Sequence, residues 1–248
     1  MAMSEIVQKI VDVISSDSGE PMAVSVTYPD DGAWHPTIAV FMDAPGMRES
    51  LYEFGRRLAG EGYRVVMPDL NHRHGRLLGW EASEVTPEVL GKISAMLGAM
   101  SDEGIQQDLD DALTTVELRD DEKLGTIGFC LGARPIYRTL MRFPDRFAVG
   151  ATWHPSLLHT EPDPPYATAA NLKQPVYIGI GTADQVQSIA MQQRFFDAVA
   201  DLDHVEVVYF EGADHAFTWP TSPNYHEEAA TVSWAKTTAL FAQHLLPG

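Results

Sequence analysis

Short apolar runs rich in β-branched residues alternate along this chain with segments that have the residue spacing of amphipathic helices. Most of the runs are bounded by Gly, Pro or Asp, as buried strands usually are. The predicted strands are Ala23–Tyr28, Thr37–Met42, Arg64–Met67, Leu124–Phe129, Phe147–Thr152, Val176–Ile180 and Val205–Phe210. Strands that alternate with helices form a mostly parallel sheet with helices on both faces. The sequence therefore predicts an α/β fold, a three-layer α/β/α sandwich with a mostly parallel central sheet.

Helical segments lie between these strands. They are predicted at Arg48–Gly60, Ile105–Leu118, Val186–Val199 and Glu227–Leu246. In the first helix Leu51, Phe54 and Leu58 fall on one face, which is expected to pack on the sheet. The segments Leu77–Glu84 and Glu161–Tyr166 are predicted to be loops near the carboxyl ends of the strands, where the catalytic groups of such sheets lie.

The composition fits one globular domain over residues 1–248. Of the 248 residues 45% are hydrophobic, which is enough for a sizeable core. The net charge of −18 repels phosphate backbones and anionic lipids, so neither nucleic acid nor a membrane is expected as a partner. The N-terminus lacks the basic start and apolar run of a signal peptide, and a single cysteine cannot form an internal disulfide. We therefore expect a cytoplasmic protein that is a monomer or a small homo-oligomer.

The single cysteine lies where a predicted strand gives way to a helix. The strand Leu124–Phe129 runs into the sequence Gly128-Phe129-Cys130-Leu131-Gly132. This G-x-nucleophile-x-G form is typical of a sharp turn, or elbow, that exposes a nucleophile above a sheet, with glycines that keep neighbouring side chains away. The positive end of the following helix favours a thiolate at Cys130. The alternative is a buried cysteine that packs as a small hydrophobic residue.

An acid and a base follow the cysteine in the order that such elbow enzymes use, which is nucleophile, acid and histidine. Asp184 comes just after the strand Val176–Ile180, and His215 comes just after the strand Val205–Phe210. The imidazole of His215 is predicted to take a proton from the thiol, and Asp184 to fix its tautomer and stabilise its charged form. The alternatives are a turn-forming role for Asp184 and a surface position for His215.

Other acidic and histidine side chains are weaker candidates. Asp214 is adjacent to His215 and ranks below Asp184 as the acid, because neighbouring side chains usually point elsewhere. His72 and His74 form an H-x-H pair, but further ligands at the spacing of a metal site are not evident. Neither a metal nor a cofactor is therefore predicted.

The chain resembles the dienelactone hydrolase family, whose members have the α/β-hydrolase fold, over roughly residues 20–247. The matching blocks, in chain order, are Asp43-Ala44-Pro45-Gly46, Gly62-Tyr63, Pro68-Asp69-Leu70, Gly128-Phe129-Cys130-Leu131-Gly132, Asp184 and Gly212-Ala213-Asp214-His215-Ala216-Phe217. The elbow cysteine is the most specific of these marks, because most α/β-hydrolases place serine there. The resemblance implies an acyl-enzyme mechanism with Cys130 as the nucleophile.

The resemblance also implies roles for residues around the triad. The oxyanion formed in the reaction would be held by the backbone N–H groups of Leu131 and Ala44. In the family a glutamate near the Ala44 loop pairs with the cysteine and helps to deprotonate it. The matching residue is Asp43, which is one methylene shorter, and we assign nucleophile activation to it.

Two departures from the family bear on the substrate. Members that cleave dienelactone hold its carboxylate with two arginines, but here Trp219 stands at one of these positions and Trp80-Glu81-Ala82 lies in the segment of the other. An indole holds a carboxylate poorly, so dienelactone is not the expected substrate. Arg73, Trp153, His154 and Trp219 are candidate substrate-binding residues on loops at the catalytic edge, with ordinary loop packing as the alternative.

The sequence thus predicts a carboxylic ester hydrolase that cleaves a small-molecule ester, lactone or thioester through a Cys-His-Asp triad and an acyl-enzyme intermediate. Two alternatives stay open. One is a ligand-binding protein that keeps the triad without turnover, which the departures from the family favour. The other is an acyltransferase, which passes the acyl group to a nucleophile other than water.

Overall fold

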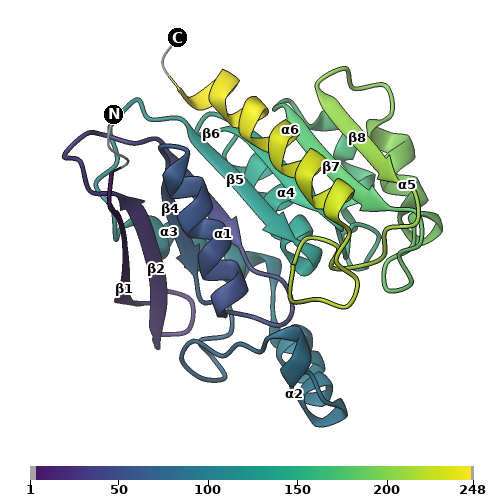
Figure 1. Ribbon diagram of the computed structural model, residues 1–248, viewed down its shortest axis with the longest axis horizontal. Coiled ribbons are helices and arrows are strands. Elements are labelled where there is room, and N and C mark those ends of the chain that lie inside the picture. The colour runs from purple at the N-terminus through teal and green to yellow at the C-terminus, as the bar shows by residue number, and fades with distance from the viewer. Residues whose placement is uncertain (1–3, 247–248) are drawn as a thin grey trace. The chain divides into compact units, whose positions relative to one another are not determined.

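The computed structural model describes residues 4–246. The chain forms two compact units, Met1–Leu124 and Gly125–Gly248, and each has its own run of neighbouring strands (Figure 1). Among the described residues, no helix is long and apolar enough to cross a membrane.

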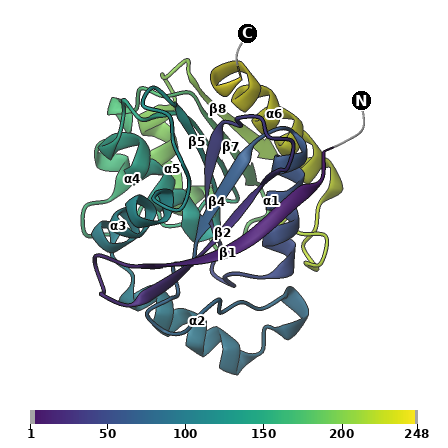
Figure 2. The same cartoon turned by 90° about the vertical axis from the view of Figure 1, so that its left-hand side faces the viewer.

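The first unit contains strands in the order β1-β2-β4-β3. Their bounds are β1 Ile6–Ile14, β2 Pro21–Pro29, β3 Thr37–Phe41 and β4 Arg64–Pro68. β1 and β2 form an antiparallel hairpin in which Ile6 lies opposite Pro29. β2 is antiparallel to β4, whereas β3 is parallel to it. Helices α1 (Glu49–Gly60) and α3 (Asp102–Leu113) lie on opposite faces of these strands, as Figure 2 shows.

The second unit contains strands in the order β5-β6-β7-β8. Their bounds are β5 Leu124–Phe129, β6 Phe147–Trp153, β7 Val176–Gly181 and β8 Val205–Phe210. β7 is parallel to both β6 and β8, so the loops that follow these three strands leave from the same edge. Helices α4 (Ala133–Arg142) and α5 (Ile189–Val199) lie on one face, and α6 (Glu227–Leu245) lies on the other (Figure 2).

Strands β3, β5 and β7 are buried along their whole length. Strands covered on both faces read as continuous apolar runs, which is why their sequences show no polar alternation. In α1 the side chains of Leu51, Phe54 and Leu58 are buried, so the apolar face predicted from their spacing faces the interior. Burial of each such large apolar side chain contributes about 1.5–3 kcal/mol to folding.

All the predicted strands are present, but the bounds of two predicted helices differ from the prediction by three residues or more at one or both ends. α3 begins at Asp102 rather than at residue 105, because Ser101 caps it by accepting the N–H of Gly104. It ends at Leu113 rather than at residue 118, and the hydroxyl of Thr115 donates to a carbonyl of its last turn. α5 begins at residue 189 rather than at 186, because Ser188 caps it.

Two elements are absent from the sequence prediction, namely β1 and α2 (Pro87–Ala99). β1 has no regular alternation of buried and exposed side chains, so its sequence carries no strand period. α2 begins at Pro87 directly after the capping residue Thr86, but it buries only Ile93 and Met96. The segments predicted as loops contain 3₁₀ turns at Ala82–Glu84 and Pro165–Ala167.

A short backbone bridge joins two loops of the first unit. Gly46, in the loop after β3, pairs with Gly79 as an isolated antiparallel bridge. Beside it, the N–H of Met47 donates to the carbonyl of Leu78 at 3.0 Å. The backbones approach so closely that a Cβ on Gly79 would lie 1.9 Å from the carbonyl oxygen of Met47. The bridge therefore depends on glycine, and it holds the loop that contains Ala44.

We expect Gly79→Ala to lower the free energy of unfolding by about 1–3 kcal/mol, because the added methyl group overlaps backbone atoms that cannot easily move aside. Gly91→Ala is the matched control, since a Cβ at this position in α2 meets no atom within 4 Å. Alanine is favoured over glycine inside a helix, so this control is expected to gain up to about 1 kcal/mol. Denaturant unfolding of both variants measures the difference, and equal stabilities would contradict the tight bridge.

Candidate active site

Cys130 occupies the sharp turn between β5 and α4. Its φ is 51°, in the left-handed region that side chains other than glycine rarely adopt. Residues Cys130–Gly132 form a single 3₁₀ turn, which contains the buried Leu131, and α4 begins directly after it. The chain thus forms the strand-to-helix turn that the sequence predicts. The half-buried thiol stands at the start of helical backbone, whose N–H dipoles favour an anion.

Asp184 and His215 are in direct contact. Nδ1 of His215 donates to Oδ2 of Asp184 at 2.8 Å. His215 is only 8% exposed and Asp184 only 2%. Oδ1 of Asp184 accepts the backbone N–H groups of Val186 and Gln187 at 2.9 and 2.7 Å. These bonds fix the carboxylate, which in turn orients the imidazole with its proton on Nδ1.

Asp214, the weaker candidate acid, does not bind the imidazole of His215. Its Oδ1 accepts the backbone N–H groups of Gln185 and His215 at 3.0 and 2.7 Å. Asp214 therefore joins the backbone of the loop after β7 to that of the loop after β8, while the ring hydrogen bond of His215 goes to Asp184.

The charge of His215 is linked to both Cys130 and Asp184. Burial by itself lowers the pKa of the imidazole, but the negative charge of Cys130 and the hydrogen bond to Asp184 outweigh it and raise the pKa to about 10. Burial by itself raises the pKa of the Asp184 carboxyl, but the hydrogen bond and charge of His215 outweigh it, so this pKa lies below its ordinary value. The imidazolium form of His215 is therefore favoured beside the carboxylate of Asp184 and the sulfur of Cys130. This arrangement can supply both a nucleophile and a proton donor.

The hydroxyl of Ser156 also contacts the thiol, although no motif singles it out in the sequence. Its Oγ lies 3.2 Å from Sγ of Cys130, and its backbone N–H donates to the carbonyl of Cys130 at 2.9 Å. Ser156 is buried and follows β6, the strand next to β5. Its one signal in the sequence is a position shortly after the strand that follows the elbow.

Asp43, in the first unit, is bound to Arg48. Its Oδ1 accepts a hydrogen bond from Nη1 of Arg48, and its Oδ2 accepts one from Nη2 at 2.8 Å. Both side chains are buried. Arg48 also donates to the carbonyl of Gly46 at 3.1 Å, and its Nε lies 3.8 Å from a carboxylate oxygen of Glu81. This ion pair therefore fixes the loop in which Ala44 is half-buried.

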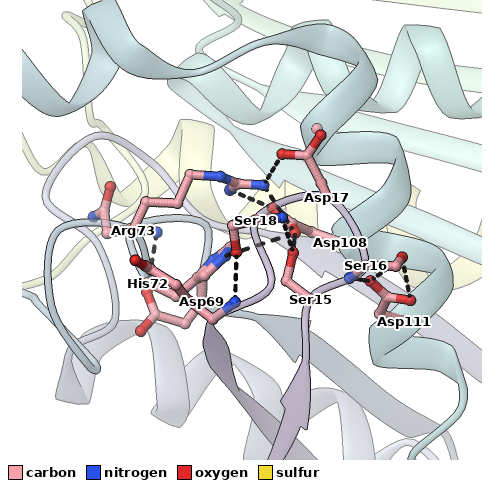
Figure 3. Close-up of polar contacts among 12 residues, drawn as sticks. Ser15, Ser16, Asp17, Ser18, Asp69, His72, Arg73, Asp108 and Asp111 are labelled. Atoms are coloured by element: carbon pink, nitrogen blue, oxygen red, sulfur yellow. Dashed lines mark hydrogen bonds and ion pairs between the residues drawn. The ribbon is translucent and has the colours of Figure 1, made fainter.

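Arg73 belongs to a polar cluster that ties the β1–β2 hairpin to α3 (Figure 3). Its guanidinium donates to Asp108 at 2.7 and 3.2 Å and to Asp17 at 2.6 Å. Beside it, Nε2 of His72 lies 3.1 Å from Oγ of Ser18. Two carboxylates thus compensate the charge of Arg73, which holds the hairpin, and a role of Arg73 in substrate binding stays a prediction. Within residues 4–246, no group of three or more His, Cys, Asp or Glu side chains is arranged to hold a metal ion.

Trp153 and His154, two further candidate substrate-binding residues, are 2% and 0% exposed. The indole N–H of Trp153 donates to Thr237 of α6 at 3.0 Å, so Trp153 packs in the core of the second unit, and its role in substrate binding stays a prediction. The ring of His154 packs edge-on against the ring of His215, with centroids 5.0 Å apart. His154 therefore supports the imidazole from the side.

Trp219 is 4% exposed and packs on Phe129, the residue before Cys130. The two ring centroids are 4.7 Å apart. Trp219 thus places an uncharged indole where the family resemblance leads one to expect a guanidinium.

The chain is similar to known proteins in both sequence and structure. The sequence model of the dienelactone hydrolase family matches residues 22–245. A "Putative carboxymethylenebutenolidase" of Methylorubrum extorquens is 29% identical over 224 residues, which cover 87% of this chain and 75% of that protein. A protein of the same name from Yersinia pestis is 27% identical over 237 residues, or 91% of this chain and 85% of that protein. The crystal structure of a "Putative Dienelactone Hydrolase" from Klebsiella pneumoniae matches with a TM-score of 0.81 at 26% identity. The match covers 97% of this chain and 100% of that one, and it confirms the predicted α/β-hydrolase fold.

The raised pKa of His215 predicts how stability depends on pH. The imidazolium contributes stability that is fully present below its ordinary pKa of 6.5 and is lost as the pH rises toward about 10. We expect the melting temperature of the parent protein to fall more over this range than that of His215→Asn, which lacks the titrating group. Thermal melts at intervals across the range measure this, and parallel curves for the two proteins would contradict it.

Proposed function

Because the chain belongs to the dienelactone hydrolase family, we propose that it hydrolyses an ester, lactone or thioester with Cys130 as the nucleophile. The observation that carries the proposal is the linkage of Cys130, His215 and Asp184. His215 is bonded to Asp184 at 2.8 Å, and the charge of Cys130 holds its pKa far above the ordinary value. A nucleophile, a base and a carboxylate that orients the base are the groups that covalent acyl catalysis needs.

In the proposed first step, Sγ of Cys130 attacks the acyl carbon and a C–S bond forms. The carbonyl electrons move to oxygen, and backbone N–H groups hold the oxyanion, a role that the family resemblance gives to Leu131 and Ala44. The intermediate then collapses, the bond to the leaving group breaks, and His215 gives its proton to the leaving alcohol or thiol. Asp184 keeps the imidazole oriented in both of its charge states.

In the proposed second step, water hydrolyses the acyl-enzyme. The neutral His215 takes a proton from water as the water oxygen attacks the thioester carbon. The C–S bond breaks, the acid leaves, and the thiolate and imidazolium form again. Both proposed steps use only groups of the protein and water, so the proposed reaction needs no cofactor.

We propose a neutral, apolar or weakly polar acyl group for the substrate. The packing of Trp219 on Phe129 supports this, because it puts an apolar ring beside the residue that precedes the nucleophile. A free carboxylate is best held by a bidentate guanidinium, and an indole offers no positive charge.

The proposal also gives Asp43 a part in nucleophile activation, as the family resemblance implies. Its ion pair with Arg48 favours an indirect part, because both carboxylate oxygens accept hydrogen bonds from the guanidinium. A buried pair of this kind keeps its loop in one conformation, and removal of either partner leaves an uncompensated charge. Asp43 would then act by positioning the loop that contains Ala44.

Hydrolysis of short-chain p-nitrophenyl esters tests the proposal. We expect Cys130→Ala to lower the rate by roughly 10³-fold or more, because the covalent intermediate cannot form. Mass spectrometry of the parent protein during turnover is expected to show the added mass of one acyl group, and the alanine variant to show none. Equal rates for the two proteins would rule out Cys130 as the nucleophile.

The same assay separates the two alternatives. A ligand-binding protein without turnover would bind the ester but release no p-nitrophenol, not even in a first burst. An acyltransferase would convert an added alcohol or amine into a new ester or amide faster than it forms the free acid.

Asp184 and Asp214 offer a matched pair of variants for the acid. We expect Asp184→Asn to lower kcat by roughly 10²–10⁴-fold, because the imidazole loses the carboxylate that fixes its tautomer. Asp214→Asn removes the same charge from a side chain that accepts the backbone N–H groups of Gln185 and His215, and a loss below about tenfold is expected. Initial rates on one ester measure both, and a larger loss for Asp214→Asn would make that residue the acid of the triad.

A further inference from the structure

We propose that Ser156 is a further catalytic residue of this site, whose hydroxyl donates a hydrogen bond to the Cys130 thiolate and holds the sulfur in its attacking position. The inference rests on the proposed function, since it gives a role in that reaction to a residue beside the sulfur. The contact that carries it is the distance of 3.2 Å between Oγ of Ser156 and Sγ of Cys130.

The charges of the neighbouring groups decide which of the two atoms donates. His215 is positively charged in the resting site because Cys130 and Asp184 hold its pKa at about 10. In the proposed first step Cys130 reacts as a thiolate, which has no proton to give. The hydroxyl of Ser156 is therefore the donor, and a hydrogen bond to an ionised acceptor is stronger than one between neutral groups.

The backbone around Ser156 is built to keep this hydroxyl in place. Its own N–H donates to the carbonyl of Cys130 at 2.9 Å, so the residue moves with the elbow. On one side, the carbonyl of Pro155 accepts a hydrogen bond from the fully buried Gln192 at 2.9 Å. On the other side, Leu157 has a φ of 64°, and its N–H donates to Gln187 at 3.2 Å. Left-handed backbone of this kind persists only where surrounding contacts over-determine it, and it gathers at functional sites.

Each group of the second unit near the sulfur has its own task. His215, after β8, carries the positive charge and moves a proton in both steps. Asp184, after β7, acts through the imidazole, and the ring of His154 packs against that imidazole with centroids 5.0 Å apart. Ser156 is the neutral donor, and it stabilises the anion without taking part in proton transfer.

The hydroxyl matters whenever the sulfur is charged. In the first step the sulfur forms a bond to carbon, and the resulting thioester sulfur is a weak acceptor. In the second step the C–S bond breaks, the electron pair returns to sulfur, and the hydroxyl donates to it again. No bond of the hydroxyl itself is made or broken, so Ser156 stabilises the nucleophile of the first step and the leaving group of the second.

Alkylation of Cys130 by iodoacetamide, followed as a function of pH, tests this role directly. Cys130 is the only cysteine of the chain, so every alkylated thiol reports this site. We expect the midpoint of the pH profile to rise by about one unit in Ser156→Ala, which is roughly a tenfold slower reaction below the midpoint. Ser156→Thr keeps the hydroxyl and is expected to remain near the parent profile.

Two further variants separate the hydrogen bond from packing. Ser156→Val has the shape of the threonine variant without its hydroxyl, so it is expected to shift like Ser156→Ala, and it serves if the alanine variant does not fold. Ser233→Ala removes another buried hydroxyl of the second unit, which contacts Tyr177 at 2.9 Å, and is expected to leave the midpoint unchanged.

Either of two results would overturn the proposal. One is an unshifted profile in folded Ser156→Ala and Ser156→Val, and the other is an equal shift in Ser156→Thr or Ser233→Ala, which would assign the effect to packing. Alkylation needs no substrate, so its result is independent of ester turnover. A shifted midpoint in a protein that hydrolyses no ester would refute the proposed reaction while keeping the hydrogen bond, whereas an unshifted midpoint in an active esterase would refute only the role of Ser156.

Discussion

The left-handed backbone of Cys130 is the constraint on which the site of the second unit depends. Cys130 lies between a fully buried strand and a helix, and its φ of 51° reverses the chain direction sharply at this point. Its carbonyl then accepts the N–H of Ser156, while its sulfur lies beside the hydroxyl of the same residue. A conformation of this kind costs about 1–3 kcal/mol and persists where both flanking elements are fixed by burial. The thiol of Cys130 is therefore positioned by the core of the fold, and not by a flexible loop.

The parts of the fold that the sequence predicts are those in which local pattern and burial agree. β5 and β8 have the predicted bounds, because each is a short apolar run that ends in turn-forming residues. β1 is not predictable from periodicity, because backbone pairing with β2 holds it in place. Its side chains show no regular alternation of burial and include the exposed Lys9 and Asp12. α2 is not predicted, because it buries few side chains and its sequence therefore shows only weak apolar spacing. Caps such as Ser101 decide helix bounds through single hydrogen bonds, which periodicity does not resolve.

The contacts of the candidate site also fall into those that the sequence predicts and those that it does not. The contact of Asp184 with His215 was predictable, because parallel strands release their loops at one edge and both residues follow such strands. Position after a strand does not say where a side chain points, however. Sequence position therefore shows neither that the indole of Trp153 packs in the core nor that the hydroxyl of Ser156 touches the sulfur of Cys130. Contacts between loops far apart in the sequence become visible only when the chain is folded.

The packing of Trp219 on Phe129 has a consequence for the end of a hydrolytic cycle. Hydrolysis turns a neutral ester into an acid that is ionised at neutral pH. In the reaction proposed above, the indole of Trp219 would offer this new anion no positive charge. The protein as a whole carries a net charge of −18, so its field repels the anion further. If the proposed reaction holds, the charge of the protein would therefore favour release of the acid over its rebinding.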